Sequence, residues 1–280
     1  MVMNKGGDCM VKCKIWEEKI PFYNPDFQNE QNKGTNIIKY YKAQADEPRP
    51  AVVIFPGGAY WGRADDHEGE KIAKFYNAHG INAAVVEYRV APYRYPIPLM
   101  DAQRAIKVMR SKTIEWNICA GQIAAIGFSA GGHLCAMTGL YEDLSRRVGD
   151  ISDMYESKPD LMILCYPVLS ADREIWHQGS FENLLGEEDL FMARNFSMED
   201  FVNENTPPCF IWHTAEDETV PVQNSLRFAN SLIKEGGYCE MHIFPKGYHG
   251  VGLGVPEFPG VEQWGELSVN FIKNTFKTNF

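Results

Sequence analysis

Residues 124–134, AAIGFSAGGHL, decide how this chain can fold. An apolar run ends in Ser129, with Gly127 two positions before it and Gly131 two positions after it. The run at 122–128 predicts a strand, and residues 130 to about 142 predict a helix. A serine at this junction fits the G-x-S-x-G pattern, in which a sharp strand-to-helix turn strains the backbone and pushes the hydroxyl above the sheet.

The small residues around Ser129 have a steric explanation. Side chains at Gly127 and Gly131 would collide with the neighbouring strand and helix, so glycine is needed at both positions. The turn also aims the amide of Ala130 toward a carbonyl under attack, and the helix that begins there adds the positive end of its dipole. We therefore expect Ser129 to be a nucleophile, with an ordinary glycine-rich turn as the alternative.

The rest of the chain alternates short apolar runs with amphipathic stretches. Predicted strands lie at 51–55, 82–88, 122–128, 161–167, 209–214 and 238–244, and predicted helices at 66–79, 100–113, 130–142, 222–235 and 261–277. This alternation predicts an α/β fold, a mostly parallel sheet with helices on both faces, in one domain over 1–280. Segments 11–16 and 36–43 are expected to add antiparallel strands at one edge.

One region interrupts the alternation. About 40 residues without a clear pattern separate two predicted strands, and structureless connections of that length are uncommon in a compact domain. This insert, at about 168–207, is rich in Glu, Asp, Phe and Asn. We expect it to form a short cap or lid.

A serine at its ordinary pKa needs a base. In a fold of this type the base follows the nucleophile and the acid in the chain, so it should lie in the loop after the last strand. His249 lies there, in PKGYHGVG, and Gly247 and Gly250 are expected to make that loop mobile. His133 and His213 are expected to have packing or structural roles instead.

The acid should follow the strand at 209–214. The next segment, AEDETVP, carries Glu216, Asp217 and Glu218. Asp217 is the best candidate because it lies between the strand end and the next helix start, where the turn should point inward, whereas its two neighbours should face solvent. A merely solvated acidic loop is the alternative.

A second donor for an oxyanion is expected after the strand at 51–55. The segment PGGAYW, 56–61, follows it directly, and the small residues Gly58 and Ala59 can offer amides to a closely approaching substrate. A plain turn is the alternative. Tyr60 and Trp61 could stack on a sugar ring or simply pack, and the sequence leaves both open.

Several of these motifs occur in order and together resemble a known family. They are FPGGAYWGRADDHEGEKIAKFYNAHGINAAVVEYRVAP, GFSAGGHLCA, TPPCFIWHTAEDETVPVQNS and FPKGYHGVG. They resemble the α/β-hydrolase superfamily, in its branch of acetyl xylan esterase-like carbohydrate esterases and their "sugar hydrolase" relatives. The resemblance runs from about residue 50 to 275. One departure is Pro56-Gly57-Gly58-Ala59, where lipase relatives usually carry His-Gly-Gly-Gly.

The resemblance implies roles for individual residues. It implies Ser129 as nucleophile, His249 as base and Asp217 as orienting acid. It also implies an oxyanion hole formed by the amides of Gly58, Ala59 and Ala130.

These roles lead to an expected activity. The chain is expected to be a serine esterase that deacetylates acetylated sugars or xylo-oligosaccharides through an acyl-enzyme, with no metal and no organic cofactor. The alternatives are a broader hydrolase on the same triad, such as a feruloyl or lipid esterase or a peptidase, and a binding protein that kept the fold without activity.

Composition excludes some partners. The formal net charge of −10 and a pI near 5.2 argue against nucleic-acid binding. No apolar run is long enough to span a membrane, and residues 1–16 lack the apolar stretch of a signal peptide. The seven cysteines form no zinc-binding set and suit a reducing compartment, so a cytoplasmic location is expected. The sequence leaves a homodimer open.

Overall fold

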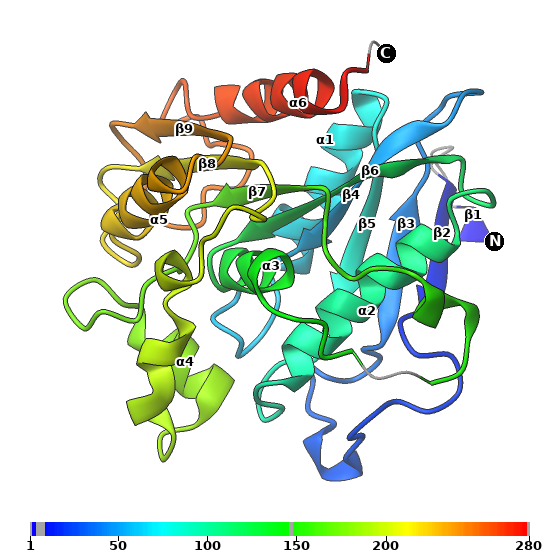
Figure 1. The fold of residues 1–280 in the computed structure, drawn as a ribbon, viewed down its shortest axis with the longest axis horizontal. Helices are drawn as coiled ribbons and strands as arrows, with labels where there is room; N and C mark the ends of the chain where they lie inside the picture. Colours follow the sequence, from blue (N-terminus) through cyan, green and yellow to red (C-terminus); the bar gives the residue numbers. More distant parts are fainter. Residues whose placement is uncertain (1, 4–8, 146–147, 279–280) are drawn as a thin grey trace.

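The computed structural model describes residues 2–3, 9–145 and 148–278. In these ranges nine strands form one sheet, in the order β1-β2-β3-β5-β4-β6-β7-β8-β9 (Figure 1). The strands are β1 (Val2–Met3), β2 (Cys9–Lys14), β3 (Ile37–Tyr41), β4 (Arg49–Phe55), β5 (Asn82–Glu87), β6 (Ile118–Phe128), β7 (Leu161–Cys165), β8 (Cys209–Thr214) and β9 (Cys239–Phe244). Strands β4 to β9 pair in parallel, and β1 to β3 are antiparallel at one edge, which confirms the predicted fold class.

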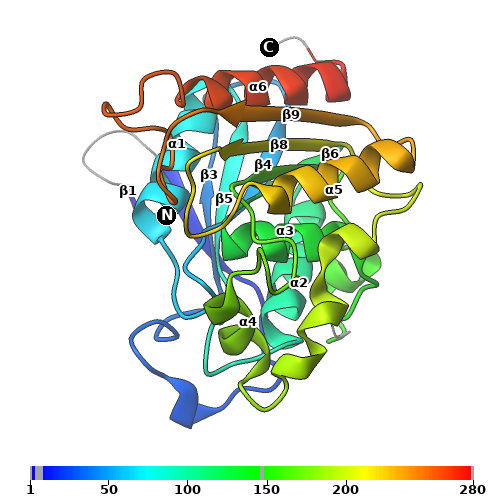
Figure 2. The ribbon, with the colours of Figure 1, turned by 90° about the vertical axis from the view of Figure 1, so that its left-hand side faces the viewer.

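Helices cover both faces of this sheet. They are α1 (Lys71–Ala78), α2 (Ile97–Ser111), α3 (Ala130–Leu140), α4 (Gln178–Leu185), α5 (Gln223–Lys234) and α6 (Gln263–Phe276). Figures 1 and 2 show α1 and α6 on one face and α2, α3 and α5 on the other. In β4 the residues after Arg49 are apolar and buried, because both faces of the sheet are covered. Val53 and Phe55 join the core under α2 and α3, while Val52 and Ile54 join the core under α1 and α6.

Two predicted helices differ from the observed ones at their starts. The helix expected at 66–79 begins with a π-helical turn, Asp65–Glu70, before α1. The helix expected at 100–113 begins at Ile97, because Pro98 lies in its first turn, where a missing amide costs no hydrogen bond. Neither feature has a signal in hydrophobic periodicity.

The insert at 168–207 is largely helical. It contains α4 and two 3-10 helices, Leu190–Phe196 and Met198–Asp200. Phe181, Leu184 and Phe196 are buried in the same core as α2 and α3. Figures 1 and 2 show α4 below α3, away from the sheet. The insert is therefore packed onto the body of the molecule and shares its core.

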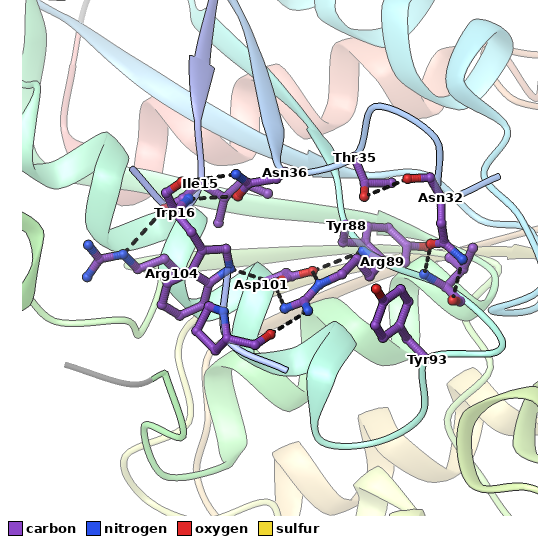
Figure 3. Close-up of polar contacts among 12 residues, drawn as sticks. Ile15, Trp16, Asn32, Thr35, Asn36, Tyr88, Arg89, Tyr93, Asp101 and Arg104 are labelled. Carbon is purple, nitrogen blue, oxygen red and sulfur yellow. Dashed lines mark hydrogen bonds and ion pairs between the residues drawn. The ribbon is translucent and has the colours of Figure 1, made fainter. Parts of the chain in front are cut away.

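A buried ion pair anchors the N-terminal part of the chain (Figure 3). Arg89, just after β5, and Asp101, in α2, are each 1% exposed. The guanidinium donates two hydrogen bonds to the carboxylate, Nε to Oδ2 at 2.8 Å and Nη2 to Oδ1 at 2.6 Å. The indole Nε1 of Trp16 donates a third, at 2.7 Å, to Oδ1. One carboxylate therefore ties the N-terminal segment to α2 and to the end of β5.

The described residues also bear on membrane insertion and metal binding. Among the described residues, no helix is long and apolar enough to cross a membrane. In the same parts of the chain, no group of three His, Cys, Asp or Glu side chains is placed to hold a metal ion. The expected lack of a signal peptide rests on residues 1–16, of which 1 and 4–8 lie outside the described residues.

Asp101→Ala tests the anchor. It leaves the Arg89 guanidinium buried without its partner, so the free energy of unfolding in urea should fall by about 3–5 kcal/mol. Glu115→Gln, which removes an exposed pair with Lys112, is the matched control and should cost less than about 1 kcal/mol. Equal, small losses for both variants would contradict the proposed anchor.

Candidate active site

Ser129 lies at the junction of β6 and α3 in a strained conformation. Its φ is 54° and its ψ is −122°, a region that residues with a side chain rarely adopt. Two hydrogen bonds hold the bend: the Ser129 amide donates to the carbonyl of Cys165 on β7, and its carbonyl accepts from the amide of Val168, both at 3.0 Å. The neighbouring strand connection therefore fixes the turn.

The flanking glycines are required by space, as expected. A Cβ on Gly127 would lie 2.1 Å from the carbonyl oxygen of Gly131. A Cβ on Gly131 would lie 2.1 Å from the carbonyl oxygen of Phe55, at the end of β4. Both oxygens belong to the backbone and cannot move aside. Strand β6, the turn at Ser129 and helix α3 can therefore pack this closely only with glycine at both positions.

The structure brings Ser129 together with the predicted base and acid. His249 Nε2 lies 2.7 Å from Ser129 Oγ, and His249 Nδ1 lies 2.6 Å from Asp217 Oδ2. Because a carboxylate oxygen can only accept, Nδ1 carries the hydrogen and Nε2 is free to accept from the serine hydroxyl. The three residues follow β6, β8 and β9, whose carboxyl ends meet at one edge of the parallel sheet.

Asp217 is buried and well supplied with donors. The amides of Thr219 and Val220 donate to Oδ1 at 3.0 and 2.9 Å. His213 Nε2 lies 3.3 Å from Oδ2. Burial alone would raise the pKa of Asp217, but hydrogen bonds from His213 and His249 hold that pKa well below its usual range. Asp217 is therefore ionised and can stabilise a positive charge on His249.

His213 has the structural role that the sequence suggested. It is fully buried, and its ring bonds to Ser225 Oγ at 2.8 Å and to the carbonyl of Val220 at 2.9 Å. These contacts, with its approach to Asp217, fasten the loop that carries the acid. The sequence did not reveal this contact with Asp217.

The glycines beside His249 have backbone conformations that favour glycine. Gly247 has φ 142° and Gly250 has φ 84°. A Cβ on Gly247 would lie 2.7 Å from Cγ2 of Thr214, whose hydroxyl donates to the Gly247 carbonyl at 2.8 Å. Gly247 therefore packs closely against the end of β8, and the expected mobility of the loop stays a prediction.

A buried carboxylate connects two loops of the site. Glu68, 3% exposed, accepts from the Gly57 amide at 2.8 Å and from the Tyr166 hydroxyl at 2.7 Å. The Tyr166 hydroxyl in turn accepts from the Gly252 amide at 3.2 Å, in the loop that carries His249. Sequence reasoning missed Glu68, because a glutamate in an acidic stretch usually faces solvent and the π-helical turn that buries it has no pattern.

The loop after β4 and the start of α3 carry the amides that the sequence predicts as oxyanion donors. Among the described residues, the amides of Gly58 and Ala59 find no backbone hydrogen-bond acceptor. The amide of Ala130, at the first position of α3, has no partner within the helix. Gly57 lies against Ser129, since a Cβ on Gly57 would be 3.0 Å from the serine Cβ. The predicted donors thus lie on segments adjoining the nucleophile.

Tyr60 does not lie where the sugar-stacking interpretation needs it. It is 1% exposed, and its hydroxyl bonds to His133 Nδ1 at 2.9 Å. Its ring packs in the core, so a sugar cannot stack on it, and the packing alternative is correct. Trp61 is 65% exposed and remains a candidate for ligand contact.

Known proteins resemble this chain over most of its length. The BD-FAE family model matches residues 38–232. The acetylxylan esterase of Xylanibacter ruminicola is 34% identical over 73% of this chain and 41% of its own length. Endo-1,4-beta-xylanase B of Butyrivibrio fibrisolvens is 35% identical over 95% of this chain and 41% of its own length. The chain thus spans about two fifths of these curated relatives.

A solved structure matches over nearly the whole of both chains. The acetyl ester-xyloside bifunctional hydrolase of Caldicellulosiruptor lactoaceticus superposes with a TM-score of 0.88 at 37% identity, covering 96% of this chain and 97% of that one. The chain belongs to the BD-FAE family, in the acetyl xylan esterase-like group of the α/β-hydrolases.

Proposed function

We propose that the protein is a serine carboxylic-ester hydrolase that removes acetyl groups from acetylated sugars or xylo-oligosaccharides. The observation that carries this proposal is the hydrogen-bonded series Asp217–His249–Ser129, with distances of 2.6 and 2.7 Å. These three side chains supply, in the order that acyl transfer needs, an ionised acid, an imidazole that the acid orients, and a hydroxyl that the imidazole can deprotonate.

The first half of the reaction forms an acyl-enzyme. His249 Nε2 takes the proton from Ser129 Oγ, which attacks the ester carbonyl. The developing negative charge on the carbonyl oxygen is stabilised by the amides of Gly58, Ala59 and Ala130. The alcohol leaves with the proton from His249. Water then repeats the sequence on the acyl-enzyme and releases the acid.

The substrate class comes from the relatives. Their names refer to acetylxylan, xylan and an acetyl ester-xyloside. We assign an acetyl group on a xylose-type sugar on this basis. The exposed indole of Trp61, beside the oxyanion loop, supplies a surface on which a sugar ring can stack. We assign residues 168–207 to a cap over this part of the molecule.

Ser129→Ala should abolish ester turnover without unfolding the protein, because it removes the nucleophile and only one oxygen atom. Initial rates with p-nitrophenyl acetate and the far-ultraviolet circular dichroism spectrum measure the two effects. A variant that kept a large share of the wild-type kcat would contradict the proposed nucleophile.

Asp217→Asn should lower kcat by about 10⁴-fold, because an amide cannot hold His249 in the required tautomer. Glu216→Gln and Glu218→Gln are matched controls on exposed neighbours and should change kcat little. The same chromogenic assay measures all three. If Glu216→Gln were the damaging change, the acid would be misplaced by one position.

A substrate series tests specificity. We expect kcat/KM to be highest for acetylated xylo-oligosaccharides and p-nitrophenyl acetate, to fall with longer acyl chains and feruloyl esters, and to be undetectable with aminoacyl-naphthylamides. Preference for long acyl chains or feruloyl esters would replace the acetyl assignment by the broader esterase, and cleavage of the amides would indicate a peptidase.

A further inference from the structure

A side chain of the insert holds the oxyanion loop. Asn183, on α4, donates a hydrogen bond from Nδ2 to the carbonyl oxygen of Ala59 at 2.9 Å. The two residues are 124 positions apart in the chain. Ala59 is a proposed oxyanion donor, so this contact joins the insert directly to the catalytic machinery.

Ala59 adopts a backbone conformation that needs support. Its φ is 54°, and the next residue, Tyr60, has φ 57°. Both carry side chains, for which the left-handed region is disfavoured. Strained residues of this kind persist only when their surroundings fix them.

The peptide before Ala59 is fixed from within the loop. The Gly58 carbonyl accepts from the amides of Trp61 and Gly62, both at 3.0 Å. Because a trans peptide is planar, with C=O and N–H on opposite sides, anchoring this carbonyl directs the Ala59 amide away from the loop. The peptide after Ala59 has its carbonyl anchored by Asn183 instead, from another part of the chain. Together the two anchors fix both dihedral angles of Ala59.

Tyr60 is fixed through a second contact with the insert. His133 Nε2 lies 2.9 Å from the carbonyl of Phe196, which can only accept, so Nε2 carries the hydrogen. Burial lowers the pKa of His133 to about 4, so the ring is neutral near pH 7. Nδ1 therefore accepts from the Tyr60 hydroxyl. Phe196 thus supports Tyr60 through His133, while Asn183 supports Ala59.

Helix α4 is a fixed support for Asn183. Phe181 and Leu184, on either side of Asn183, are buried in the core. The carbonyl of Leu184 accepts from the amide of Tyr95 at 2.8 Å, in the connection before α2. The position of the Asn183 amide is therefore set by packing on the body of the molecule.

We propose that Asn183 is a positioning residue that keeps Ala59 in its left-handed conformation and so aims the Ala59 amide at the oxyanion. This role rests on the proposed esterase function. Without the Asn183 bond, Ala59 can relax toward negative φ. The turn whose Trp61 amide holds the Gly58 carbonyl has Ala59 and Tyr60 as its central residues, so this change breaks the turn and the Ala59 amide leaves the site. Because the negative charge on the carbonyl oxygen develops in the transition state and is absent from the bound ester, the loss falls on kcat and leaves KM close to the wild-type value.

The test is Asn183→Leu, which keeps the side-chain size and removes the donor. With p-nitrophenyl acetate we expect kcat to fall by about 10- to 100-fold, less than the 10²–10³-fold loss of a whole oxyanion donor. Asn183→Asp, which cannot donate when ionised and repels the carbonyl, should show the same loss. Asn203→Leu is the matched control, since it removes an asparagine bond to the Phe201 carbonyl of the insert and should leave kcat unchanged.

Making the same substitution in an Ala59→Gly variant separates a positioning role of Asn183 from a general displacement of α4. In Ala59→Gly, the left-handed conformation carries no side-chain penalty, so the Asn183 bond matters less. Asn183→Leu should then cost a smaller factor in kcat than it does with Ala59 present. The same factor in both backgrounds would mean that α4 has simply shifted, and it would overturn the proposal.

The same measurements distinguish a wrong role for Asn183 from a wrong proposed function. If the wild type hydrolyses the ester, Ser129→Ala does not, and both Asn183 variants keep wild-type kcat, the positioning role is overturned while the esterase stands. An inactive wild type would overturn both.

Discussion

The left-handed backbone at Ser129 is the constraint on which the rest of the site depends. The bend ends β6 and starts α3 within one residue, and it leaves no room for a Cβ at Gly127 or Gly131. It is tolerated because the last residue of β7 accepts from its amide and the connection after β7 donates to its carbonyl. The bend then fixes one point at the carboxyl edge of the sheet, which the other loops must reach.

Three loops reach that point, and each is fastened by a polar side chain that lies outside the loop itself. His213 secures the Asp217 loop, and Glu68 links the loop after β4 to the loop of His249 through Tyr166. Asn183 supports the loop after β4 from the insert. Such bonds are worth more in a desolvated site than in water, since an unmet buried group is costly. The proposed chemistry therefore relies on groups that touch no substrate.

The sequence predicted the parts of this arrangement that depend on local pattern. Apolar runs located the strands, and position after a strand end singled out Ser129, Asp217 and His249, which the structure brings within hydrogen-bonding distance. It could not predict burial decided by distant residues. Tyr60 can lie in the core because its hydroxyl donates a hydrogen bond to His133, which is 73 positions away in the chain. A π-helical turn that buries an acidic residue likewise leaves no trace in hydrophobic periodicity.

Reaction with a fluorophosphonate tests most directly whether an imidazole activates the hydroxyl on this bend. The reagent phosphonylates a serine that a neighbouring base has made nucleophilic, whatever ester the enzyme prefers. Intact mass and peptide mapping should show one adduct per chain, on Ser129. An unmodified protein, or an adduct on a different residue, would contradict the account.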